Sequence, residues 1–314
     1  MNNAPAANTT PALYGALPLA DWGVIRAQGE EARKFLHGQL TQDVEGLQPG
    51  TARLAGFCSA KGRLLATFVM WSPAADEVLL ACSADLLPAV LKRLSMFVMR
   101  AKCKLGDAST ELPLWGLAGT LPGVDLPTKV WQLAPQEPGV WIRLPDASAA
   151  DGTATARYLG AGVAAPAAPA LDAALWAGLE VQSGVVRVVA ATTEQFVPQM
   201  VNLELVGGVN FQKGCYPGQE IVARSQYRGT LKRRSYVVEA AADLSPGQEV
   251  FHSVDPEQPA GMVVLAGRAP GGVAVGLVEL KIAALGSGTL HAGSVSGALL
   301  TPATLPYAFP AELA

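Results

Sequence analysis

Apolar residues recur at different spacings along the chain, and these spacings predict its elements. Residues 30–44 carry apolar side chains at helical spacing behind two glutamates, which suit the positive end of a helix dipole. Pro49 and Gly50 then break this predicted helix. Strand-like apolar runs follow at residues 52–59, 63–71 and 77–83.

A second predicted helix covers residues 86–99, with Asp85 as its N-cap and an apolar side chain at every third or fourth position. Further strands are expected at residues 101–106, 113–119 and 139–144. Because strands and helices alternate without a regular βαβ rhythm, the predicted fold class is α+β.

The composition and the apolar spacing change twice in the second half of the chain. Residues 145–170 are rich in Ala, Gly and Pro and are interpreted as a surface connection, and residues 171–184 return to helical character. From Ser235 onward, short apolar runs separated by Gly and Pro turns predict a small β-barrel or sandwich of about 80 residues.

Composition and charge narrow the function classes. The net charge of −3 gives no global attraction to nucleic acid or to an anionic membrane, and no apolar stretch approaches the ~20 residues of a membrane span. The first residues lack the features of a signal peptide. The four cysteines and three histidines lie far apart in the sequence, so we expect reduced thiols, no metal centre of its own and a cytoplasmic location.

Residues 198–234 are the segment richest in unusual chemistry. A sharp turn at residues 213–218 precedes a predicted helix from Pro217 to about Tyr227, with proline at the first helical position. This places Cys215 just before a helix N-terminus and two residues from Lys213, and both features favour the thiolate. Equally, Cys215 could be a small buried residue that fills a tight turn.

The same segment holds the main basic concentration of the chain. It could receive the carboxylates of a polyglutamylated cofactor or the phosphates of RNA, or it could simply be a solvated helix face and strand end. Its residues are Arg224, Arg228, Lys232, Arg233 and Arg234.

The motif KGCYPGQEIVAR, which begins at Lys213, closely resembles the signature K-G-C-[YF]-x-G-Q-E of the YgfZ family. The flanking PQMVNLELVGGVNFQ and QYRGTLKRR also fit, as do FLHGQLTQDV and AKGRLLATF nearer the N-terminus. The resemblance covers nearly the whole chain, which is therefore identified as a member of this family.

The resemblance implies a fold similar to the T-protein of the glycine cleavage system and to the folate domains of dimethylglycine and sarcosine oxidases. Such proteins have three subdomains around a central channel that binds tetrahydrofolate. The corresponding division here is a flexible tail at residues 1–12, a folate-binding region of two interleaved α+β subdomains at 13–234, and a C-terminal β-barrel at 235–314.

The resemblance also implies a function and a site. Members of the family support iron–sulfur enzymes, including one that methylthiolates tRNA, so the implied partners are folate, iron–sulfur client enzymes and, indirectly, tRNA. Cys215 and Lys213 become the candidate catalytic residues. The candidate cofactor-binding residues are Gln182, Gly214, Tyr216, Gly218, Gln219, Glu220, Arg224 and Arg228.

Two departures from T-protein bear on the reaction. Residues 60–72 contain no carboxylate where T-protein has an aspartate near the reacting folate nitrogen, so aminomethyl transfer loses an acid–base group. Gln182 stands where T-protein grips the pterin with a glutamate, and a neutral amide is a weaker acceptor for that edge. Trp71, Trp115 and Trp176 could wall a ring pocket, but packing is their commoner role.

Three functions remain open from the sequence. The leading one is an accessory protein for iron–sulfur enzymes that uses folate and Cys215 together. The others are a tetrahydrofolate-dependent aminomethyltransferase and a non-enzymatic docking module for client enzymes or tRNA. The chain is expected to be a monomer, because it shows neither heptads nor a long exposed apolar edge.

Overall fold

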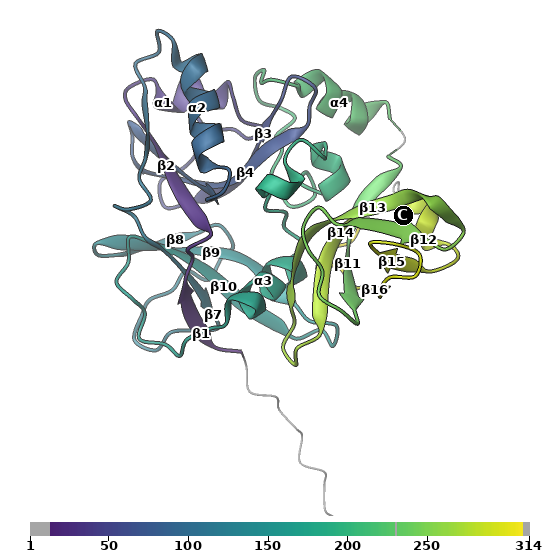
Figure 1. The fold of residues 1–314 in the computed structure, drawn as a ribbon. Helices are drawn as coiled ribbons and strands as arrows, with labels where there is room; N and C mark the ends of the chain where they lie inside the picture. Colours follow the sequence, from purple (N-terminus) through teal and green to yellow (C-terminus); the bar gives the residue numbers. More distant parts are fainter. Residues whose placement is uncertain (1–12, 230, 310–314) are drawn as a thin grey trace, which may run out of the picture.

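The computed structural model describes residues 13–229 and 231–309, which form two five-stranded antiparallel sheets and a closed β-barrel (Figure 1). The first sheet is flanked by helices α1 (Ala32–His37) and α2 (Leu87–Val98). Its strands, in spatial order, are β3 (Ala52–Cys58), β4 (Leu64–Ala74), β5 (Glu77–Ser83), β2 (Trp22–Gln28) and β6 (Lys104–Asp107).

The second sheet lies below the first in Figure 1, and helix α3 (Ala173–Gln182) lies between it and the barrel. Its strands, in spatial order, are β1 (Gly15–Pro18), β7 (Leu114–Ala118), β10 (Ala154–Ala161), β9 (Gly139–Ser148) and β8 (Leu133–Gln136).

The barrel is closed, so it leaves no unpaired strand edge. It follows helix α4 (Gln219–Tyr227), and short 3₁₀ turns lie at Ala190–Thr192, Pro198–Val201 and Ile282–Leu285. The barrel strands, in spatial order, are β11 (Arg233–Ala240), β14 (Ala274–Lys281), β13 (Asp255–Arg268), β12 (Glu249–His252), β15 (Leu290–Ala292) and β16 (Leu299–Ala303).

The first sheet is buried on both faces, which explains the continuous apolar run along β4. Phe68 and Met70 belong to the cluster under α1 and α2, whereas Val69 and Trp71 belong to the cluster shared with the second sheet. Successive side chains of a strand point to opposite faces, so a strand between two apolar layers needs apolar residues at every position. The second sheet, α3 and the first sheet thus enclose the centre of the molecule.

Three sequence predictions are wrong in detail. Residues 145–170 are no surface connection: β10 lies inside the second sheet, paired with both β7 and β9, with Tyr158 and Leu159 buried. The helix expected over residues 30–44 ends at His37. Asp85 does not cap α2 with its side chain but accepts a hydrogen bond from the Ala190 N–H at 2.9 Å.

None of the helices in the described ranges has the length and apolar character required to cross a bilayer.

Candidate functional site

Residues 213–218 form a loop that is seated on the turn between β3 and β4. Gly218 has a φ of +80°, and a Cβ there would lie 2.4 Å from the Ser59 carbonyl oxygen and 2.6 Å from the Gly62 Cα. Gly62 has a φ of +70°, and a Cβ there would lie 2.8 Å from the Ile221 Cβ. Glycine is therefore required on both sides, and the two motifs KGCYPGQE and AKGR meet in space.

Lys213 anchors this loop to the end of α1. Its Nζ donates hydrogen bonds to the carbonyl oxygens of His37 and, at 2.9 Å, of Leu40, and it lies 4.9 Å from the centre of the Tyr216 ring. Burial lowers the pKa of Lys213 to about 8, against the opposing charges of Asp43, Cys215 and Glu45. At neutral pH the half-buried ammonium is still charged.

Cys215 differs from the other cysteines in its exposure. Cys58 and Cys82 are buried, and burial raises the pKa of each thiol to about 12. Cys103 is half-buried, and burial raises its pKa as well. Cys215 is exposed and lies within electrostatic reach of Lys213. The reading of Cys215 as a buried space-filling residue is therefore wrong.

Helix α4 begins later than the sequence suggests. Gly218 occupies the N-cap position in the left-handed region, so Gln219 is the first helical residue and Pro217 lies outside the helix. Cys215 is thus four positions before the first helical residue, separated from it by the turn that Gly218 makes. Glu220 is exposed in the first turn, whereas Tyr216 is buried beneath the loop, where burial raises the pKa of its phenol. The ammonium of Lys213, more than the helix end, is the positive group nearest Cys215 in the chain.

His37 lies against the same loop from the α1 side. Its Nδ1 is 3.1 Å from Asp43 Oδ1 and 3.8 Å from Glu45 Oε2. Its Nε2 is 3.6 Å from the point that a Cβ on Gly214 would occupy, beside the backbone that leads directly into Cys215. Cys215, Lys213 and His37 therefore gather at one end of the first sheet.

Further contacts hold the Asp43 carboxylate beside His37. Burial raises the pKa of Asp43, but the Gly46 N–H at 2.9 Å and the Arg53 guanidinium, 3.4 Å from Oδ2, outweigh it, so the net pKa is lowered. The carboxylate is thus ionised at neutral pH. Among the described residues, no group of three or more His, Cys, Asp and Glu side chains has the arrangement of a metal site.

The basic segment 224–234 divides into an outward and an inward part. Arg224, Arg228 and Lys232 are exposed, and none of the three forms an ion pair in the described parts of the chain. Arg233 instead donates to both oxygens of Glu279, at 2.9 and 2.7 Å. Arg234 is buried against Glu204. Only the outward three remain for an anionic partner, so the basic patch is smaller than the sequence suggests.

A narrow cavity lies between the two sheets, at the centre of the molecule. The indoles of Trp22 and Trp131 and the ring of Phe68 contribute apolar walls, and Arg157 and Glu180 contribute polar groups. The space that admits a water-sized sphere is about 30 Å³, room for about two water molecules. A flat bicyclic ring enters only if lining side chains move.

Arg187 and Glu180 separate this cavity from a wider cleft of about 620 Å³ at the α3–barrel boundary. Arg187 donates to both oxygens of Glu180, at 3.1 and 3.0 Å, and to Asp21 at 2.8 Å, and its guanidinium stacks on Trp22. Glu180 is already partnered, so a ligand must compete with Arg187 for it.

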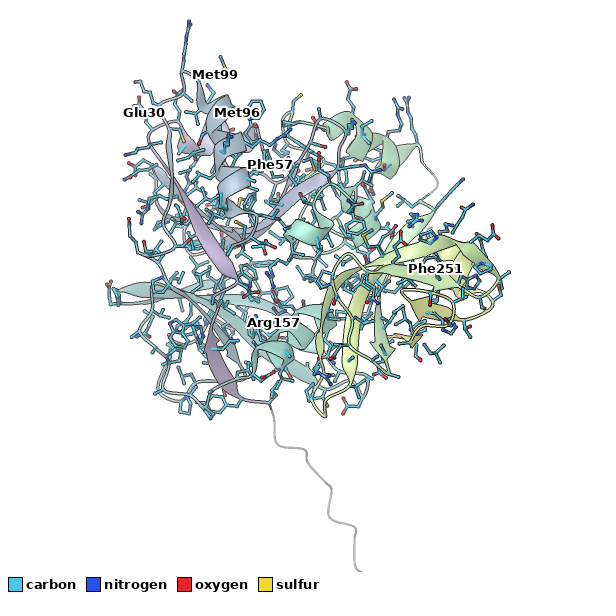
Figure 2. All side chains as sticks on the ribbon, in the orientation of Figure 1. Glu30, Phe57, Met96, Met99, Arg157 and Phe251 are labelled. Carbon is cyan, nitrogen blue, oxygen red and sulfur yellow. The ribbon has the colours of Figure 1, made fainter. Side chains whose placement is uncertain are left out.

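Gln182 is buried in α3 but is not among the residues that line the cavity; Glu180 and Ser183 of the same helical stretch are. Arg157, at the centre of the molecule in Figure 2, packs over the Trp176 ring, and its buried Nε has no hydrogen-bond partner within residues 13–229 and 231–309. Burial lowers the pKa of Arg157 to about 10. An unsatisfied buried donor between aromatic walls suits a ring that carries an oxygen or nitrogen acceptor.

The cavity and the Cys215 loop lie at different places along this part of the chain. Thr67 of β4 faces the cavity, whereas Gly62, in the turn before β4, supports the loop, five positions away. Extended backbone advances about 3.3 Å per residue, so the two places are roughly 15 Å apart along the strand. A ring in the cavity does not by itself reach Cys215.

The residues missed by sequence reasoning are His37, Asp43, Arg157 and Glu180. His37 lies in FLHGQLTQDV, only six positions before Asp43, and that short spacing is the one signal that links them. Their proximity to Cys215 depends on contacts between segments more than 170 residues apart, which no local pattern encodes.

Comparison with known proteins finds relatives in sequence and a structure with a similar fold. No family model matches. The tRNA-modifying protein YgfZ of Serratia proteamaculans is 30% identical over 251 residues, which are 73% of this chain and 72% of the relative. The tRNA-modifying protein YgfZ of Edwardsiella ictaluri is 30% identical over 265 residues, 78% of each chain.

Among solved structures, the aminomethyltransferase T of the glycine cleavage system from Bartonella henselae superposes with a TM-score of 0.72 at 17% identity, over 94% of this chain and 86% of that one. This likeness confirms the predicted α+β, T-protein-like fold of three subdomains with a small C-terminal barrel.

Proposed function

The chain belongs to the YgfZ family, and from this premise we propose that it is an accessory protein of tRNA modification that sustains iron–sulfur enzymes through the thiol of Cys215. The relatives are named for tRNA modification. The observation that carries the proposal is the exposed Cys215 held on a glycine-fixed loop beside the half-buried ammonium of Lys213.

The loop favours a reactive thiol for two physical reasons. A positive charge next to a cysteine stabilises the thiolate, which is the form that acts as nucleophile or soft ligand. The close backbone contact of Gly218 with Ser59 and Gly62 holds the loop in one position. The thiol therefore faces solvent, where a client protein can reach it. Reduced thiols of this kind persist in the cytoplasm, where we place the protein as a monomer.

Tetrahydrofolate is the cofactor that the fold family implies, and the central cavity offers matching groups. Trp22, Phe68 and Trp131 would sandwich the ring, while Glu180 and the unpartnered Nε of Arg157 would orient its polar edges. When bound, tetrahydrofolate carries a one-carbon unit on its ring nitrogens. The residues of this chain would hold the ring and exclude water from it.

Ordinary aminomethyl transfer is the weaker alternative. β4 contributes Thr67, Phe68 and Val69 to the cavity, and none of them is an acid or base of suitable strength. The cavity's carboxylate, Glu180, is held in an ion pair with Arg187. We therefore place the chemistry of this protein at Cys215.

The test of the proposal is complementation of a bacterial strain that lacks its own copy of the gene, with methylthiolated tRNA and the activity of an iron–sulfur enzyme as readouts. Cys215→Ala should fail, whereas Cys103→Ala, which removes a half-buried thiol away from the loop, should complement. Full complementation by Cys215→Ala at wild-type protein levels would overturn the proposal.

A docking role is the second candidate, because Arg224 and Arg228 are exposed and unpaired among the described residues. In that case Arg224→Glu together with Arg228→Glu would abolish complementation, while Cys215→Ala would be silent. Lys92→Glu together with Arg100→Glu, which makes the same change of charge at two exposed positions on and just after α2, is the matched control.

A further inference from the structure

We propose that a pocket between the barrel and the turn that joins β3 to β4 binds a free α-amino acid with an apolar side chain. The pocket is separate from the groups used in the proposed function, because neither Cys215 nor the lining of the central cavity contributes to it. The space that admits a water-sized sphere is about 240 Å³. Pockets for drug-sized ligands span ~300–1,000 Å³, so this one suits a smaller molecule.

The barrel contributes a row of three side chains to this pocket. Glu249 on β12 pairs with Met262 on β13, and Met262 pairs with Glu279 on β14. Directly opposed residues of neighbouring strands point to the same face of a sheet. Neighbouring strands lie about 4.8 Å apart, so roughly 10 Å separates the two glutamates along this row. An ammonium and a carboxylate that each make one hydrogen bond of about 2.9 Å to the protein fit within such a gap.

The buried charges of the pocket neutralise each other. Glu279 is 2% exposed, and its two oxygens accept hydrogen bonds from Nη1 of Arg233 at 2.9 and 2.7 Å. Burial raises the pKa of Glu279, and the guanidiniums of Arg233 and Arg63 oppose this rise. The Glu279 carboxylate is therefore already partnered within the protein, so a ligand must be recognised by the other charges of the pocket.

Two charges of opposite sign remain at the mouth of the pocket. Arg63 and Glu249 are both exposed, and neither forms an ion pair within the described ranges of the chain. Nη1 of Arg63 donates to the carbonyl oxygens of Gln195 and, at 3.4 Å, of Glu194, and these contacts hold the guanidinium at the rim. Its remaining N–H groups can donate to a carboxylate. A cation and an anion that line one pocket without pairing are complementary to a zwitterion.

Most of the other lining side chains are apolar and suit the side chain of an amino acid. Phe196 is 3% exposed, and Met200, Pro259 and Met262 are partly buried. Methionine is unbranched and adapts to irregular shapes, so these walls favour a flexible apolar side chain over a charged one. An apolar pocket discriminates weakly between side chains of similar size, and L-leucine and L-methionine are therefore both expected to bind.

The test is isothermal titration calorimetry of the full-length protein with L-leucine, L-methionine and two analogues of leucine. 4-Methylpentanoate lacks the ammonium and 3-methylbutylamine lacks the carboxylate, so each leaves one charged group of the protein without its partner. Both should bind at least ~10-fold more weakly than L-leucine. Arg63→Gln and Glu249→Gln should each weaken the binding of L-leucine by ~10-fold or more, because each removes the partner of one ligand charge.

The control variants are Lys61→Gln and Glu257→Gln, which remove exposed charges of the same signs from the same turn and from β13, outside the pocket. Both should bind L-leucine as wild type does, and circular dichroism establishes that each variant is folded. Three results would overturn the proposal: no saturable binding of either amino acid, equal affinity for L-leucine and 4-methylpentanoate, or wild-type affinity in Arg63→Gln and Glu249→Gln. Cys215→Ala should retain the binding, which keeps this result separate from the complementation test of the proposed function.

Discussion

Single residues decide where the site forms. The sequence placed Cys215 next to Lys213, and that pairing survives in the structure because it is local. The sequence did not place His37 beside them, because the contact closes only when the end of α1 and the loop 213–218 pack together. The exposure of Cys215 likewise follows from the position of the loop and not from its composition.

Gly218 provides a direct test of how the loop is held. Gly218→Ala adds a Cβ 2.4 Å from the Ser59 oxygen at a residue with a φ of +80°, whereas Gly207→Ala adds one at the same φ with nothing within 4 Å. We expect Gly207→Ala to cost about 1 kcal/mol of unfolding free energy and Gly218→Ala about 3 kcal/mol. Urea denaturation of both variants measures this difference. Equal losses would show that the loop does not depend on the close contact.

The lowered pKa of Lys213 predicts how the stability of the protein depends on pH. Its pKa is lowered to about 8 in the folded protein from an ordinary value of 10.5, so the unfolded chain binds more protons between these values. The contribution of Lys213 to the free energy of unfolding must therefore rise as the pH increases from 8 to 10.5. The neutral amine that forms in this range can still donate hydrogen bonds to the carbonyls of His37 and Leu40. Urea denaturation of wild type and Lys213→Met at pH 7 and pH 9.5 should show the advantage of wild type growing with pH. An advantage that shrinks would contradict this interpretation.

At the scale of elements, local patterns succeeded where a run of apolar side chains marks the strand. β3, β4 and β5 form a meander, and each was predicted within three residues of its ends. β10 was missed because its alanines and glycines carry little strand propensity. Its strand character comes from pairing on both sides, with β9 and with the more distant β7. The helix predicted over 30–44 was too long, because a periodic apolar pattern does not reveal where tertiary contacts replace helical ones.

The buried ion pair between Arg234 on β11 and Glu204 fixes the segment that precedes the loop 213–218 to the barrel, and mutation of the pair can test this. Arg234 also donates to the Gln199 carbonyl at 2.9 Å, and two of its nitrogens have no partner among the described residues. Burial raises the pKa of Glu204, and Arg234 opposes this rise. Arg234→Met should cost about 3 kcal/mol, because it leaves an uncompensated buried carboxylate, and adding Glu204→Leu should recover most of that loss. A double-mutant cycle of urea denaturation curves measures the coupling, and strictly additive losses would contradict it.

At the scale of the whole molecule, the three subdomains are joined by very close backbone contact. Gly178 of α3 lies against Arg268 of β13, where a Cβ would be 1.9 Å from the carbonyl oxygen, and Gly267 approaches Gly178 equally closely. This contact brings α3, and with it Glu180, to the boundary between the central cavity and the wider cleft. The family fold was recognisable from the sequence through its motifs, but which residues line its centre follows from this packing alone.

Gly178→Ala tests that contact. In an isolated helix the substitution would stabilise by about 1 kcal/mol, whereas here the added methyl group must separate α3 from the barrel. We expect a net loss of about 2 kcal/mol and a lower melting temperature by calorimetry. An unchanged or higher melting temperature would show that the two elements do not touch as described.

We propose that the thiol of Cys215 is what this protein contributes to its client enzymes. Its most direct test is the amount of methylthiolated tRNA, measured by mass spectrometry, in a deletion strain that expresses Cys215→Ser at the wild-type level. Serine preserves the size and exposure of the side chain and removes only the thiol chemistry. If the thiol is required, the Cys215→Ser strain should contain no more methylthiolated tRNA than the deletion strain. Wild-type methylthiolation in the Cys215→Ser strain would contradict it and leave the exposed arginines of α4 as the functional surface.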